Sequence, residues 1–313
     1  MSAPAPAAVA GTTDSPTRYA ALSVAAAVAT IALKTAAWAL TGSVGLLSDA
    51  LESLVNLAGA VMALWMLRIA TRPADEDHAY GHSKAEYFAS AFEGAMILAA
   101  AFGIALAAAW RLVTPQPLER LGLGVAVSLA ASAINLVVAL VILRAGKRLG
   151  SITLEANARH LLTDVWTTAG VLAGIAGVAF TGWLRIDPLV ALLVAANIVR
   201  TGFGIVRRSI LGLMDTALPD TERARLLAAI EPHLEGGVQM HALRTRQSGA
   251  RRFVSFHVLV PGDWSVHRGH QLLEAIEADV RHVLPAATVF THLESLEDPA
   301  AWDDTGLDRS PRV

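Results

Sequence analysis

Long apolar runs dominate the first two-thirds of the chain. A helix that crosses the hydrocarbon core of a bilayer needs about 20 predominantly apolar residues. Tryptophans lie near the ends of three of the runs, as interface aromatics do. The pattern therefore predicts an α-helical membrane protein with six transmembrane helices, near residues 19–40, 44–69, 88–112, 120–144, 153–180 and 186–206.

From about residue 209 the pattern becomes that of a small soluble domain. A helix is expected from Asp220, and a second, amphipathic helix over 266–284. Strands are expected over 238–245, 252–260 and 287–292, the second with alternating apolar residues. The order helix–strand–strand–helix–strand predicts an α+β domain with a sheet covered on one face.

These shifts in pattern divide the chain into four segments. Residues 1–17 are rich in Ala, Pro, Ser and Thr and are expected to be a disordered tail. They lack the basic start and apolar core of a secretory signal. The transmembrane domain then covers 18–208, the soluble domain 209–298 and a loose tail 299–313.

Positive charge in the loops predicts the orientation of the bundle. Arginine and lysine gather at the second and fourth connections and after the sixth helix, whereas the first connection, 41–43, has no charge. Loops rich in Lys and Arg stay in the cytoplasm. Both termini, and the whole soluble domain, are therefore expected there.

Composition supports the membrane class and limits the partners. The chain is 54% hydrophobic and 17% charged, with a mean hydropathy of +0.49, which is too apolar for an ordinary soluble protein. A net charge of −2 argues against a nucleic-acid partner. The chain has no cysteine, so any metal must be held by His, Asp, Glu or Asn.

Two pairs of polar residues lie inside the apolar runs, each pair four positions apart. They are Glu52 with Asn56 and His160 with Asp164. This spacing puts both members on one helix face, and carboxylates in a membrane normally face the bundle interior. The pairs could supply four ligands to one divalent cation, with Asp49 as a further candidate. The alternative is that these side chains bond neighbouring helices.

A second set of candidate ligands lies in the connection between the second and third spans. Asp75, His78 and His82 fall within eight residues on the expected cytoplasmic side. Gly81 permits a tight turn that would bring His82 back towards the other two. The alternative is a polar loop with solvated charges.

Seven of the ten histidines follow residue 230. His257 alternates away from the apolar face of its strand, His241 and His292 also fall on or beside expected strands, and Glu294 lies just beyond. Several such residues on one sheet face favour a metal site or a dimer contact over solvated surface histidines.

Taken together, these segments resemble the cation diffusion facilitator family, in particular its bacterial zinc/iron efflux branch. The resemblance covers residues 18–298. The segments that carry it are LLSDALESLVN, RPADEDHAYGHSKAEYF, EANARHLLTDVWTT, IDPLVALLVAANI and HALRTRQSGARRFVSFHV. No one of them is specific, but the set is.

The resemblance implies roles for particular residues. The transport site maps onto Glu52, Asn56, His160 and Asp164, and a cytoplasmic loop site onto Asp75, His78 and His82. Sites between paired C-terminal domains map onto His241, His257, His270, His292 and Glu294, and a structural charge pair onto Lys84 and Asp215. It also implies a homodimer, a ferredoxin-like C-terminal domain, a bacterial inner membrane location, and exchange of cytoplasmic metal for external protons.

One departure from the family concerns the second-helix pair. This pair is usually Asp-x-x-x-Asp or His-x-x-x-Asp, and here it is Glu52-x-x-x-Asn56. With a neutral His160, the four residues carry two negative charges instead of three. Asparagine is a weaker zinc ligand than carboxylate but suits harder ions such as manganese.

The sequence therefore predicts a divalent metal efflux transporter, and not an enzyme. We expect zinc or iron(II) as substrate, with manganese, cobalt, nickel and cadmium as further candidates, and no organic cofactor. Protons compete with the metal for the same ligands, so antiport by alternating access is expected. The alternatives are a passive metal channel, which would move no protons in return, and a membrane-anchored metal sensor or metalloenzyme.

Overall fold

The structure is a computed structural model of the whole chain, and it describes residues 15–41, 44–114, 122–285 and 287–303. The chain divides into two compact units, Met1–Ile210 and Leu211–Val313. This division lies close to the predicted boundary between the transmembrane and soluble domains. Each unit is described by itself below.

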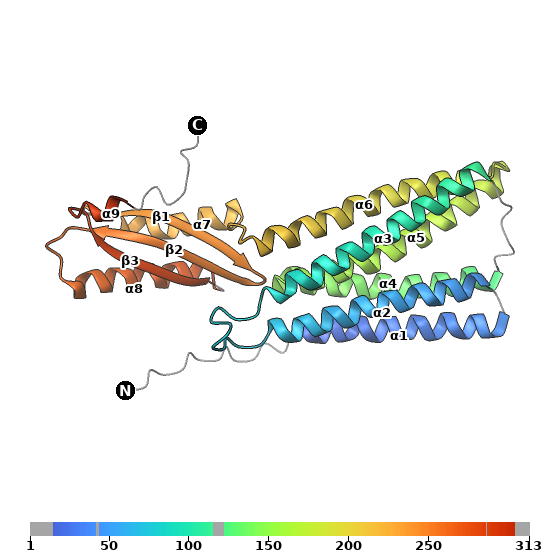
Figure 1. Cartoon of the computed structure of the whole chain (residues 1–313), viewed down its shortest axis with the longest axis horizontal. Helices are drawn as coiled ribbons and strands as arrows, with labels where there is room; N and C mark the ends of the chain where they lie inside the picture. The colour runs from blue at the N-terminus through green and yellow to red at the C-terminus, as the bar shows by residue number, and fades with distance from the viewer. Residues whose placement is uncertain (1–14, 42–43, 115–121, 286, 304–313) are drawn as a thin grey trace. The chain divides into compact units, whose positions relative to one another are not determined.

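The first unit is a bundle of long helices (Figure 1). They are α1 (Pro16–Thr41), α2 (Val44–Ala70), α3 (Ala85–Val113), α4 (Gly122–Leu149), α5 (Ile152–Thr181) and α6 (Ile186–Leu213). Each has 26 to 30 residues. At about 1.5 Å per residue, every one is long enough to cross a hydrocarbon core of about 30 Å. α1 begins at Pro16, a residue favoured in the first turn, so the last two residues of the predicted N-terminal tail, 16 and 17, belong to the helix.

Length and hydropathy together identify four described segments that could span a membrane. They are Pro16–Ala37, Ala85–Val113, Ala126–Leu149 and Pro188–Leu213, in α1, α3, α4 and α6. α2 contributes a shorter apolar stretch, Leu57–Ala70. The bundle is therefore that of a multi-pass membrane protein. Spanning by α2 and α5, which carry the predicted transport ligands, stays a prediction.

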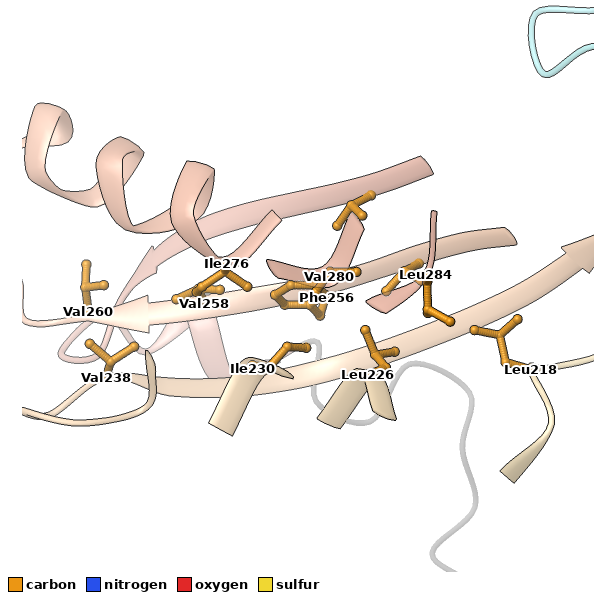
Figure 2. Close-up of a cluster of buried hydrophobic side chains, with 12 residues drawn as sticks. Leu218, Leu226, Ile230, Val238, Phe256, Val258, Val260, Ile276, Val280 and Leu284 are labelled. Atoms are coloured by element: carbon orange, nitrogen blue, oxygen red, sulfur yellow. The ribbon is translucent and has the colours of Figure 1, made fainter. Parts of the chain in front are cut away.

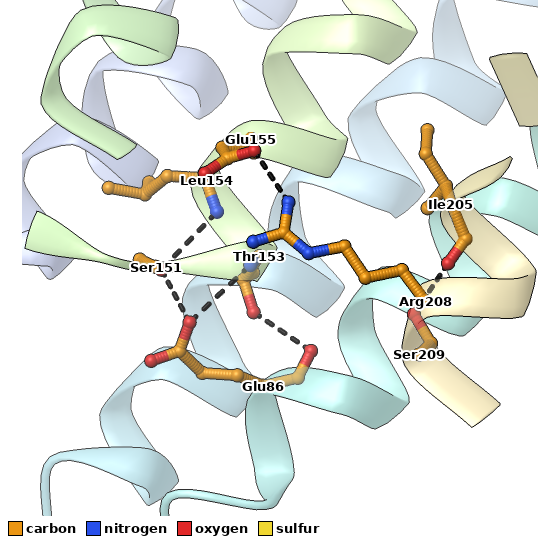
Figure 3. Close-up of polar contacts among 8 residues, drawn as sticks. All are labelled: Glu86, Ser151, Thr153, Leu154, Glu155, Ile205, Arg208 and Ser209. Atoms are coloured by element: carbon orange, nitrogen blue, oxygen red, sulfur yellow. Dashed lines mark hydrogen bonds and ion pairs between the residues drawn. The ribbon is translucent and has the colours of Figure 1, made fainter. Parts of the chain in front are cut away.

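A buried polar network joins the starts of α3 and α5 (Figure 3). Glu86 is 6% exposed, and its carboxylate accepts hydrogen bonds from Ser151 Oγ at 2.5 Å and from the backbone N–H of Thr153 at 3.4 Å. Ser151 in turn accepts from the N–H of Leu154 and caps α5. An acid at a helix N-terminus is favourable. This network therefore fixes the start of α5 against the start of α3.

The second unit has the predicted order of elements. Helix α7 (Asp220–Ile230) and a 3-10 turn, η1 (Glu231–His233), precede β1 (Gln239–Ser248), β2 (Arg251–Val260), α8 (Val266–Val283), β3 (Ala287–Ser295) and α9 (Ala300–Asp303). The sheet order is β1-β2-β3, with β1 and β2 antiparallel and β2 and β3 parallel. The small α+β fold predicted from the sequence is confirmed.

One face of this sheet packs against α7 and α8 (Figure 2). Val254, Phe256 and Val258 alternate along β2 and are all buried, 0–1% exposed, in one cluster with Ile230 of α7 and Ile276 of α8. Full burial of each such side chain contributes about 1.5–3 kcal/mol. Since successive strand residues face opposite sides, the other face is left for the polar residues between them.

The prediction of a loose tail from residue 299 is wrong for its first residues. Ala300–Asp303 form the one-turn helix α9, because the indole N–H of Trp302 donates a hydrogen bond of 3.0 Å to the carbonyl of Leu296. The prediction for 304–313, like that of disorder for 1–14, falls outside the described residues.

Candidate metal sites

The predicted pair on α5 faces the interior of the bundle. His160 is 5% exposed, and its Nδ1 lies 3.5 Å from Oε2 of Glu93 on α3. One turn further, the half-buried Asp164 accepts a hydrogen bond of 3.3 Å at Oδ2 from the side-chain amide of Asn135 on α4. α5 therefore holds an imidazole and a carboxylate between α3 and α4.

The predicted partners on α2 are described only by their backbone. Asp49, Glu52 and Asn56 lie in the helix, whereas their side chains lie outside the described part of the chain. α2 packs against both α3 and α5. Gly59, seven positions after Glu52 and three after Asn56, shares their helix face. It contacts the Glu93 carboxylate, since a Cβ at Gly59 would lie 3.1 Å from Oε1.

Two residues of this region did not figure in the predictions. Glu93 and Asn135 are polar residues within the predicted spans 88–112 and 120–144. Both are buried, at 0% and 8% exposed. Polar residues inside a membrane are costly and usually functional, so their position within apolar runs was the signal. Neither has a ligand-type residue four positions away, so helix spacing alone does not mark them as part of a site.

The three predicted loop residues lie close together. His78 Nδ1 is 3.1 Å from Asp75 Oδ1, and His82 Nε2 is 3.3 Å from Asp75 Oδ2. One ligand atom from each residue lies within 4.8 Å of the others. Gly81 has a φ of 80°, as expected for the tight turn. The arrangement offers two imidazole nitrogens and a carboxylate to one cation.

The surroundings of Asp75 favour its ionised form. Desolvation acts to raise the pKa of its carboxyl, but it is outweighed by hydrogen bonds from the backbone N–H and ring of His78 and by the charges of His82 and His78. The net result is a pKa below the ordinary value. Since metal ligands must be deprotonated, the Asp75 carboxylate is available at neutral pH.

The strand register brings three histidines into one row on the face of the sheet that points away from α7 and α8, called the open face below. His241 of β1 lies opposite His257 of β2, which lies opposite His292 of β3. Glu294 follows two positions after His292 and so shares its face. A bulge in β1 directly after His241, with Ala242 at a φ of 52°, ends this part of the register. Such bulges re-aim side chains.

Within this row, Glu294 is the shared partner. Its Oε2 is 2.9 Å from His241 Nε2, and its Oε1 is 3.0 Å from His257 Nδ1. Ligand atoms of these three residues lie within 4.8 Å of one another. His292 Nε2 is 3.6 Å from Glu294 Oε1 but its side chain is 67% exposed, so it lies at the rim. The indole of Trp302 lies nearly perpendicular to the ring of His241, with ring centroids 5.9 Å apart.

Three of the residues assigned by resemblance are not joined to these groups by the contacts described. His270 is exposed on α8, and its Nε2 is 4.0 Å from Glu274 Oε1. Asp215 accepts a hydrogen bond of 3.1 Å from Arg246 within the second unit. Lys84 belongs to the first unit, so its pairing with Asp215 stays a prediction, as does the role of His270 between paired domains.

Both units match models of one protein family. Residues 20–214 match the cation efflux transmembrane domain, and residues 218–296 match the cytoplasmic domain of cation efflux proteins. The chain belongs to the cation efflux family. This is the cation diffusion facilitator family to which the sequence motifs pointed, and the transporter is therefore not an enzyme.

Whole-length relatives agree with this assignment. The transporter is 52% identical over 284 residues to the uncharacterized transporter sll1263 of Synechocystis, a match that covers 91% of this chain and 92% of the relative. It is 33% identical over 285 residues to the cation-efflux pump FieF of Shewanella oneidensis, covering 90% and 94%. FieF of Klebsiella pneumoniae is 31% identical over 286 residues, covering 91% and 93%. The chain is a multi-pass cation efflux transporter with a dimerisation domain at its C-terminal end.

Proposed function

We propose that this transporter exports divalent metal ions from the cytoplasm in exchange for protons, by alternating access in a homodimer. The observation that carries the proposal is the placement of His160 and Asp164. Both side chains turn into the bundle between α3 and α4, where a charge is costly unless it serves a pathway. Glu52 and Asn56, on the helix that packs against α5, complete the proposed transport site.

The chemistry of these ligands couples metal to protons. A divalent ion binds the neutral imidazole and the ionised carboxylates, and a proton binds the same atoms. Metal and proton therefore exclude each other from the site. When the site opens to a more acidic exterior, protons displace the metal, and their return to the cytoplasm resets the carrier.

The donor set suits borderline and hard divalent ions. Imidazole and carboxylate favour zinc and iron(II), and the amide of Asn56 tolerates manganese. Zinc or iron(II) is our first expectation, followed by manganese, cobalt, nickel and cadmium. Relatives named as cation-efflux pumps support this class of substrate.

The other two groups of ligands would act on the cytoplasmic side. We assign metal binding to Asp75, His78 and His82 in the loop and to the row centred on Glu294 in the C-terminal domain. The latter would sense cytoplasmic metal between paired domains. This assignment places both termini in the cytoplasm and the helices in a bacterial inner membrane, as the positive loop charges favour.

The test is metal transport into reconstituted vesicles with an imposed pH gradient. Zinc, iron(II), manganese, cobalt, nickel and cadmium are compared for the unchanged chain, for Asp164→Ala and for Asp263→Asn, a control acid on the surface of the second unit. We expect gradient-dependent transport that Asp164→Ala abolishes and Asp263→Asn retains. Transport that ignores the gradient would identify a channel. Metal binding without transport of any ion would identify a sensor.

A further inference from the structure

Glu93 is a fully buried acid that the proposed transport site does not use. It lies on α3 and is 0% exposed. Among the described residues, neither of its carboxylate oxygens has a hydrogen-bond partner. Buried carboxylates are normally paired, hydrogen-bonded or bound to a cation, so an acid in these surroundings needs a functional explanation.

The contact that Glu93 makes is with a proposed metal ligand. Its Oε2 lies 3.5 Å from Nδ1 of His160, and both side chains are almost wholly enclosed, at 0% and 6% exposed. Histidines that bind a metal through one ring nitrogen commonly donate the other N–H to a carboxylate, which fixes the ring and its tautomer. Glu93 places its carboxylate beside Nδ1 of His160, the position that such an acceptor occupies.

We infer that Glu93 is a positioning residue of the transport site, whose carboxylate accepts the Nδ1–H of His160 and directs Nε2 towards the transported cation. The inference rests on the proposed function, because it assigns the cation to His160. The distance of 3.5 Å is longer than an ordinary hydrogen bond. A cation on Nε2 draws electron density from the ring and makes Nδ1–H a stronger donor, which shortens the contact when the site is filled.

The packing of α2 keeps this position open for the acid. A Cβ at Gly59 would lie 3.1 Å from Oε1 and 3.2 Å from Oε2 of Glu93, closer than side chains normally approach. A side chain at this position would push the carboxylate away by a few tenths of an ångström, so glycine allows its closest approach to α2. Gly59 follows Glu52 and Asn56 on the same helix face, so Glu93 reaches the face that carries the other two proposed ligands.

Charge supports the same assignment. The four proposed ligands hold two carboxylates, Glu52 and Asp164, where the two-aspartate form of the site has three. Glu93 adds a third carboxyl group, with Oε2 3.5 Å from His160 Nδ1, that could offset the charge of a bound divalent cation.

The experiment is a double-mutant cycle on zinc binding to the full-length chain in detergent. Asp75→Ala and His257→Ala form the background, because they remove a ligand from each of the other two groups. In this background, Glu93→Ala is expected to weaken zinc binding about 10- to 100-fold. Combined with His160→Ala, the same change is expected to alter affinity less than about twofold, since coupled residues are non-additive. Glu93→Gln, which keeps an oxygen acceptor for Nδ1–H, is expected to bind better than Glu93→Ala.

Glu86→Gln is the matched control. Glu86 is a buried acid seven positions earlier on α3, and its contacts are with the start of α5. We expect it to lower thermal stability and leave zinc affinity unchanged. Equal weakening by Glu93→Ala with and without His160 would overturn the positioning role and identify a direct ligand. Unchanged affinity in Glu93→Ala would remove Glu93 from the site.

These measurements distinguish failure of the positioning role of Glu93 from failure of the proposed function. If the unchanged chain moves metal without regard to the pH gradient, proton exchange fails while the binding cycle still decides the role of Glu93. If the background chain binds no zinc that depends on Asp164, the transport site fails, and the positioning role fails with it.

Discussion

Asn135 makes a second contact that would position a proposed metal ligand, Asp164. Its side-chain amide donates to Asp164 across the gap between α4 and α5, at 3.3 Å. This hydrogen bond helps to orient the Asp164 carboxylate. Asp164 is thus contacted by Asn135 from α4, and His160 is contacted by Glu93 from α3.

The Asn135 contact predicts a loss of transport affinity. Asn135→Leu removes the amide that donates to Asp164 Oδ2 and so weakens the orientation of the carboxylate. We therefore expect the KM for the transported metal to rise about 10-fold or more. Ser132→Ala, one turn earlier on α4, is the control and should leave KM unchanged. A KM that Asn135→Leu does not alter in vesicle transport would contradict the role.

At the scale of elements, the helices and strands follow from the sequence more closely than the site does. Apolar runs of spanning length and strict alternation in β2 are local signals, and the observed elements begin and end near the predicted residues. The His160–Glu93 and Asp164–Asn135 contacts join different helices. Spacing along one helix cannot reveal such pairs, because they depend on how α3, α4 and α5 pack.

The row of histidines on the sheet also could not be predicted in full from local sequence patterns. Alternation assigned His257 to the open face, but the alignment of His241 with His257 depends on the bulge that follows His241 in β1. The docking of Trp302 beside His241 depends on a turn at 295–298 that has no periodic pattern. Both features are set by tertiary packing.

Small residues let the membrane helices approach each other closely, and Gly94 tests this for α3 and α6. A Cβ at Gly94 would lie 2.7 Å from Val206 Cγ2 and 3.2 Å from the Val206 backbone nitrogen. We therefore expect Gly94→Ala to destabilise the transporter by about 1–3 kcal/mol through overpacking, measured by thermal unfolding in detergent.

Gly103 on the same helix provides the control. A Cβ there would meet nothing within 4 Å. Gly103→Ala should be neutral or stabilising, by up to about 1 kcal/mol, because alanine is the better helix former. Equal destabilisation by both substitutions would show that close packing at Gly94 is not the cause.

An ion pair between α7 and β2 predicts a pH dependence for the second unit. Two of the three guanidinium nitrogens of Arg252, Nε and Nη2, each donate a hydrogen bond of 3.0 Å to a carboxylate oxygen of Glu222. These hydrogen bonds lower the pKa of Glu222 below its ordinary value of 4.5, against desolvation and with help from the charges of Arg252 and Arg225. The stabilisation is therefore present above pH 4.5 and is lost as pH falls through the lower, folded-state pKa.

Glu222→Gln is the corresponding variant. We expect it to lower the free energy of unfolding at pH 7 by about 0.5–1 kcal/mol, since solvent screens this partly exposed pair. The difference from the unchanged chain should shrink to nothing in acid, below the folded-state pKa. A difference that stays constant from pH 7 to pH 3 in denaturant titrations would contradict the ion-pair explanation.

At the scale of the whole molecule, the three groups of ligands divide into one inside the bundle and two outside it. Under the proposed function, a cation in the bundle is released on every cycle, whereas Glu294 and its histidines would hold one through many cycles. Occupancy of the C-terminal group can thus report the metal concentration to the transport step. Such coupling between sites is typically worth a factor of about 5 to 150 in an equilibrium.

This coupling predicts a concentration-dependent defect for a change far from the transport ligands. His257 contacts Glu294, and its ring lies against those of His241 and His292 in tilted arrangements, so His257→Ala should empty the C-terminal group. We expect transport at low metal to fall about fivefold or more, while saturating metal restores most of the rate because the transport site itself is intact. His282→Ala, an exposed histidine on the same domain, should behave like the unchanged chain. If His257→Ala instead lowered the rate equally at all metal concentrations, the domain would serve dimerisation alone and the sensing role would be wrong.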